Sequence, residues 1–145
     1  MFTAFPLLAI PVFFYNLFAL TKLLGVAKAM ASESANSTLT SQLMSIPMPG
    51  GAHWVIAWGD VLILLSLILL FFELIRSTHT DKVAIINHSL SLILFIVCLV
   101  EFLLMPGFAT STFFLIAVMT LLDVLAGFIV TIVSARKDFE FTGAR

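Results

Sequence analysis

The chain has 145 residues, of which 61 % are hydrophobic and only 10 % are charged. Because soluble domains carry about 25 % charged residues, this composition excludes a water-soluble globular protein and predicts that lipid covers most of the surface. The net charge of −1 gives no sign of a nucleic-acid partner, and the single cysteine, Cys98, excludes an internal disulfide and a cysteine-based metal cluster.

Four apolar stretches are each long enough to cross about 30 Å of hydrocarbon as a helix. They are residues 2–24, 54–75, 83–105 and 108–134. Lipid offers no hydrogen-bond partners to a backbone, so each stretch is predicted to be helical despite its Val, Ile and Phe content. The sequence therefore predicts an all-α integral membrane protein, a single domain over residues 1–145 with four transmembrane helices in an up-down antiparallel bundle.

The connections between these stretches differ in length. Residues 25–53 are predicted to form a polar loop, with a turn at Pro47–Gly51. The second and third stretches are joined by residues 76–82, and the third and fourth by Pro106–Gly107. Short connections make the last three helices antiparallel neighbours. The first helix is tethered more loosely, and we expect that it is free to pack on a partner.

The distribution of basic residues predicts the orientation. With four spans, both termini and the second connection share one side, which holds five of the seven Lys and Arg residues. The side richer in Lys and Arg is cytoplasmic, so both termini are predicted to be cytoplasmic, with residues 25–53 extracytoplasmic and residues 135–145 a short cytoplasmic tail. The expected location is the bacterial inner membrane.

Ionisable side chains inside a bilayer are costly and are the best sequence clue to function. The predicted spans contain Asp60, Glu73, His88, Glu101 and Asp123. At a rise of about 1.5 Å per residue, counting back from the connections places Asp123 near mid-span, level with Ser91 and about 4.5 Å axially from His88. This predicts an intramembrane polar cluster of Asp123, His88, Ser91 and Thr120.

The same residues also have structural interpretations. Asp60 and Glu101 fall near one surface, where we expect solvated side chains. Glu73 is expected to form an ion pair with Arg76, three residues later. Asp123 either bonds Ser91, His88 or Thr120 across helices as a structural link, or binds an ion or proton, or contacts another subunit.

Small residues recur at helical spacing beside these polar groups. Gly127 follows Asp123 by four residues, and Gly59, Ser66 and Glu73 are seven residues apart. Since small side chains let membrane helices approach closely, Gly127, Gly59 and Ser66 are predicted to lie at helix–helix contacts.

No nucleotide or catalytic motif is present, and only one histidine, His88, lies within a predicted span, too few for a bis-histidine haem in one chain. We therefore expect no cofactor, no metal and no enzymatic activity; a quinone- or lipid-binding enzyme lacks the site chemistry. The first hypothesis is a non-catalytic membrane subunit. It contacts the lipid bilayer and either forms a homo-oligomer or binds a larger membrane complex. The alternative is an oligomeric ion- or proton-conducting channel or transporter element that uses Asp123 and His88.

Overall fold

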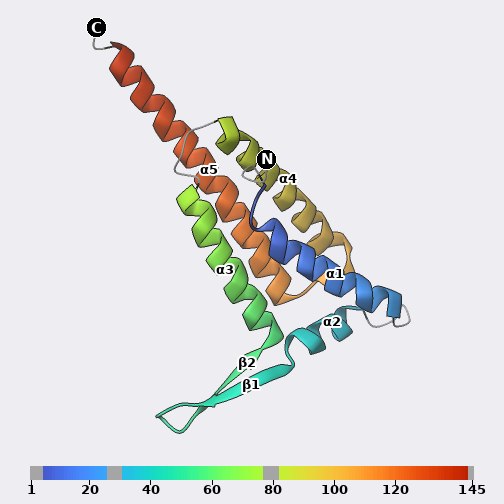
Figure 1. Cartoon of the computed structure of the whole chain (residues 1–145). Coiled ribbons are helices and arrows are strands. Elements are labelled where there is room, and N and C mark those ends of the chain that lie inside the picture. The colour runs from blue at the N-terminus through green and yellow to red at the C-terminus, as the bar shows by residue number, and fades with distance from the viewer. Residues whose placement is uncertain (1–4, 26–30, 77–81, 144–145) are drawn as a thin grey trace.

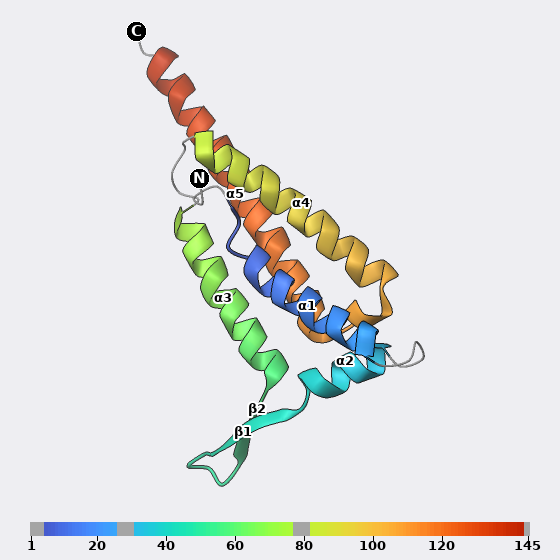
Figure 2. The same cartoon turned by 45° about the vertical axis from the view of Figure 1, so that its right-hand side comes forward.

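The computed structural model describes residues 5–25, 31–76 and 82–143, and it is mostly helical (Figure 1). Within these residues, three helices are long and apolar enough to cross a membrane. They are α3 (Trp58–Arg76), α4 (Lys82–Leu104) and α5 (Ser111–Gly143). Helix α5 packs against both α3 and α4, so it is the central helix of the three (Figures 1 and 2).

The first helix, α1 (Ala9–Gly25), is shorter, and its described apolar part covers Ala9–Ala19. It begins later than predicted because Pro6 precedes a turn, in which the Ala9 amide donates to the Pro6 carbonyl at 3.1 Å. The structure therefore supports three helices of membrane-spanning length and does not confirm a fourth.

One face of α1 packs against the rest of the described chain, and its other face, with Phe13, Phe14 and Leu17, is exposed, so packing on a partner stays a prediction. Tyr15 is buried among Phe108 and Phe113, with ring centroids 5.4 and 4.6 Å away. Its hydroxyl lies 2.6 Å from Thr110 Oγ1 and donates to the Gly107 carbonyl at 3.2 Å. These contacts join α1 to η2 (Pro106–Phe108), the short turn before α5.

Removing the Tyr15 hydroxyl should loosen this attachment. Tyr15→Phe keeps the ring but leaves buried Thr110 with one partner fewer, so we expect the free energy of unfolding in detergent to fall by about 1–2 kcal/mol. Phe14→Leu, on the exposed face of α1, should change it much less. Equal losses in the two variants would argue against the Tyr15 contact.

The described part of the predicted polar loop, residues 31–53, has regular secondary structure. It contains α2 (Ala31–Leu39) and strand β1 (Gln42–Pro47), which pairs antiparallel with β2 (His53–Ala57). Trp54 and Ile46 are paired across this hairpin. Both residue types, aromatic and β-branched, favour an extended backbone. The predicted turn is present: Gly51 has φ +83°, and the Met48 amide donates to the Ala52 carbonyl at 2.8 Å. A two-stranded sheet therefore corrects the all-α prediction.

The hairpin also changes the helix boundaries. The second predicted span began at residue 54, but residues 53–57 belong to β2 and α3 begins at Trp58. Asp60 Oδ2 accepts the Ala57 amide at 2.9 Å, as in the second half of a capping box, and so fixes the start of α3. At the other end of the chain, α5 continues through the predicted tail to Gly143.

Candidate functional site

A group of polar side chains lies between the three long helices. We define the polar cluster as Glu73 on α3, Asn87, His88 and Ser91 on α4, and Asp123 on α5. All of them are buried except His88, which is half-buried. Buried side chains from three helices thus converge on one region of a chain whose outer surface is apolar.

Glu73 is fully buried, and both of its carboxyl oxygens accept hydrogen bonds. Oε1 accepts from Asn87 Nδ2 at 3.0 Å, and Oε2 accepts from the backbone amide of Leu8 at 3.2 Å. Leu8 directly precedes α1, so Glu73 lies where amides without helical partners and the helix dipole favour a carboxylate.

The predicted ion pair between Glu73 and Arg76 is wrong, because Glu73 faces α1 and α4 instead. In the described part of the chain, Arg76 Nη2 is buried without a hydrogen-bond partner. Glu73 and Arg76 are three residues apart and therefore lie on the same turn of α3. The carboxyl group of Glu73 nevertheless points to its hydrogen-bond donors in the interior.

Asp123 is in the opposite situation to Glu73. Its side chain is fully buried, yet among the described residues neither carboxyl oxygen has a hydrogen-bond partner. Ser91 lies beside the carboxyl without a well-formed hydrogen bond, and Glu73 is close enough for the two carboxyl groups to interact electrostatically. A carboxylate held in this way is expensive in hydrocarbon, so Asp123 is the least satisfied acid of the polar cluster.

Thr120 does not serve as a partner for Asp123. Its hydroxyl donates to the Ala117 carbonyl of its own helix at 2.7 Å, as threonines in apolar helices often do. The structure thus brings Asp123, His88 and Ser91 into one region, with Thr120 buried one turn away and bonded elsewhere.

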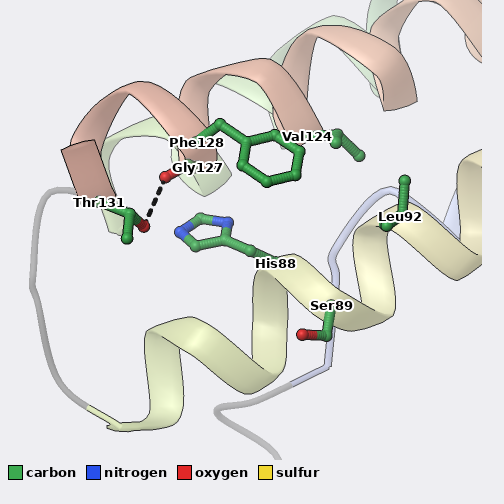
Figure 3. Close-up of a pocket in the computed structure, with 7 residues that line it drawn as sticks. All are labelled: His88, Ser89, Leu92, Val124, Gly127, Phe128 and Thr131. Atoms are coloured by element: carbon green, nitrogen blue, oxygen red, sulfur yellow. Dashed lines mark hydrogen bonds between the residues drawn. The ribbon is translucent and has the colours of Figure 1, made fainter.

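The His88 ring lies directly against Gly127 (Figure 3). A Cβ atom added to Gly127 would come within 2.7 Å of His88 Cε1, and it would come closer still to Cγ and Nδ1. Within the described residues, neither ring nitrogen of His88 has a hydrogen-bond partner. Glycine at position 127 therefore provides the space for an imidazole between α4 and α5.

Adding one methyl group at this contact should be destabilising. In Gly127→Ala the new Cβ must displace the His88 ring, so we expect the free energy of unfolding to fall by about 1–3 kcal/mol even though alanine favours helix. Gly107→Ala is the matched control, because a Cβ there meets no atom within 4 Å. Unfolding curves in detergent micelles measure both, and an unchanged stability of Gly127→Ala would contradict the contact.

The remaining predicted residues lie away from the polar cluster. A Cβ at Gly59 would lie 2.7 Å from Thr112 Oγ1 and 3.2 Å from the Leu39 carbonyl, so Gly59 is at a close contact with α5 and α2. Ser66 is buried and donates to the carbonyl of Leu62 at 2.7 Å.

The two acids expected near the surface differ. Asp60 is exposed at the start of α3, whereas half-buried Glu101 accepts a hydrogen bond from Asn16 Nδ2 at 3.2 Å. Glu101 therefore helps to attach α1, and solvent is not its sole partner.

Sequence reasoning missed Asn87 and the Leu8 amide, the two donors to Glu73. Asn87 carried a usable signal, since a polar amide next to His88 in an apolar helix needs a partner. The Leu8 amide has no side-chain signature, and only the packing of α1 reveals it.

The polar cluster does not resemble a metal centre. Over residues 5–25, 31–76 and 82–143, no group of three His, Cys, Asp or Glu residues is placed to hold a metal ion. Two carboxyl groups and an imidazole can instead accept and release protons. Comparison of the chain with protein-family models, with curated proteins and with solved structures finds no match.

Proposed function

We propose that this protein is a non-enzymatic, proton-conducting element of a membrane, which binds and releases protons at the polar cluster. The observation that carries the proposal is Asp123, a fully buried carboxyl near Glu73 whose two oxygens have no partner in the described protein. His88 packs against Gly127, one helical turn after Asp123. Acids and histidines inside a membrane protein mark ion pathways and proton relays, among other functional sites.

The difference between the two carboxyl groups supports this proposal. Glu73 is held by two donors and is fixed in place, whereas Asp123 has no fixed donor. Two ionised carboxyl groups in one buried region repel each other, and a proton bound to Asp123 removes that repulsion between Asp123 and Glu73. His88 adds an imidazole to this group, a side chain that can accept and donate a proton.

The other hypothesis, a non-catalytic subunit of a larger complex, stays open. Tyr15 and Asn16 hold one face of α1 against the rest of the chain, but Phe13 and Phe14 on its other face are exposed. A bundle of so few helices encloses little interior volume for a conducting path. We therefore propose that conduction across the whole bilayer uses a homo-oligomer.

Proton flux tests the proposed function. Purified protein reconstituted into liposomes with a trapped pH-sensitive dye should acidify or alkalinise the lumen when a potassium diffusion potential is imposed. Protein-free liposomes and liposomes with a heat-denatured sample are the controls. A flux equal to that of the controls, with correctly folded protein in the membrane, would reject conduction.

We further propose that α1 is a fourth span and that both termini face the cytoplasm of a bacterial cell. Helix α1 is apolar and runs alongside the long helices (Figures 1 and 2), and most Lys and Arg residues fall on the side of the termini. Ser37 on α2 is exposed, so Ser37→Cys should react with an impermeant maleimide in intact cells. Reaction only after the membrane is permeabilised would contradict this orientation.

A further inference from the structure

The hairpin of β1 and β2 has one face that consists only of apolar side chains. In an antiparallel pair, directly opposite residues point to the same side of the sheet, and successive residues of a strand point to opposite sides. The register pairs Met44 with Ile56 and Ile46 with Trp54, and we call these four side chains the apolar hairpin face. The other side of the hairpin includes the polar Ser45.

The described chain leaves the apolar hairpin face largely uncovered. Met44 and Trp54 are 51 % and 55 % exposed, and the two isoleucines are half-buried. The sequence has no Asp, Glu, Lys or Arg between Glu33 and Asp60, so the hairpin lacks these side chains entirely. A hairpin in water commonly carries charges that protect its strand edges, and an isolated two-stranded hairpin is only marginally stable there. An apolar environment therefore suits this face better than water.

The position of the hairpin indicates which apolar environment it meets. Strand β2 ends at Ala57, and α3, a helix of membrane-spanning length, begins at the next residue. The hairpin therefore starts at the depth where α3 enters the hydrocarbon. It extends to the side of the bundle, away from the direction of the long helices (Figures 1 and 2). An element that begins at the end of a span and extends sideways lies along the membrane surface.

We infer that the hairpin is a membrane-surface anchor, whose apolar face lies at the boundary between lipid headgroups and acyl chains. Tryptophan is enriched at this boundary, and apolar faces of surface-bound elements are buried there. Trp58, the first residue of α3, is 52 % exposed, so exposed tryptophans lie on both elements that meet at this depth. The inference goes beyond the proposed proton conduction and does not depend on it.

The competing occupants of this face are water and a second copy of the chain, since exposed strand edges can pair with another molecule. Fluorescence separates the three cases, because the chain has only two tryptophans, Trp54 and Trp58. Trp58→Phe leaves Trp54 as the single fluorophore. Its quenching is measured in lipid nanodiscs, which leave both membrane surfaces open to solvent. The quenchers are aqueous iodide and lipids with a nitroxide either near the headgroup or near the end of the acyl chain.

The matched control is Ser45→Trp in a chain that also carries Trp54→Phe and Trp58→Phe. It places a single tryptophan on the other side of the hairpin, next to Ile46 in the same strand. Circular dichroism checks that both variants are folded.

We expect the nitroxide near the headgroup to quench Trp54 several-fold more strongly than the nitroxide near the chain end, with little quenching by iodide. The introduced tryptophan of the control should be quenched chiefly by iodide. Quenching of Trp54 by iodide and not by lipid would overturn the anchor in favour of water. Quenching by neither would overturn it in favour of a protein contact, and equal lipid quenching in both variants would contradict the assignment of this face.

Discussion

Asp123→Asn should fold normally and reduce proton flux in liposomes to the level of protein-free membranes. Asparagine has nearly the shape of aspartate, and no donor is lost because Asp123 accepts no hydrogen bond in the described structure. An amide cannot take up and release a proton near neutral pH, so the step assigned to Asp123 is removed. Gel filtration and circular dichroism establish folding, and the dye assay measures flux.

Glu101→Gln is the matched control for this result. Glu101 is also a carboxyl group in a predicted membrane helix, but it lies outside the polar cluster and accepts a hydrogen bond from Asn16, which glutamine can also accept. We expect this variant to retain most of the flux. If Asp123→Asn conducts protons like the unmodified protein, the carboxyl has only a structural role.

Glu73→Leu should have the largest effect on stability among these variants. It leaves the buried amides of Leu8 and Asn87 without their acceptor, and each unpaired buried donor costs about 1–3 kcal/mol. We expect the attachment of the α1 N-terminus to α3 to weaken, visible as a lower midpoint of denaturation in detergent and as faster proteolysis near residue 8.

Glu73→Gln separates hydrogen bonding from charge at the same position. Glutamine keeps an acceptor oxygen for one of the two donors, so it should retain most of the stability that leucine loses. Equal destabilisation by the two substitutions would show that the carboxylate charge, and not the hydrogen bonds, holds the N-terminus of α1.

The long helices and the neighbourhood of Asp123 were predictable from sequence because lipid imposes simple geometry. A fixed hydrocarbon thickness sets helix length, and short connections fix the relative depth of neighbouring residues. Counting from Gly107 placed Asp123 level with Ser91, and the structure places these two side chains beside each other.

The contacts of Glu73 could not be predicted by the same reasoning. The nearest charged residue in sequence, Arg76, suggested a local ion pair, but the actual donors are a backbone amide 65 residues away and Asn87 on the next helix. The hairpin over residues 42–57 was missed for a different reason, since its short strands are mostly exposed and lack a strict alternation of apolar and polar residues.

Infrared difference spectroscopy of the protein in lipid bilayers, recorded as the pH is lowered, tests the central claim most directly. The carbonyl stretch of a protonated carboxyl group reports proton binding to a buried acid without requiring transport. We predict a carboxyl band that appears on acidification in the unmodified protein and in Glu101→Gln, and that is absent in Asp123→Asn. An identical band in all three proteins would contradict proton binding at Asp123.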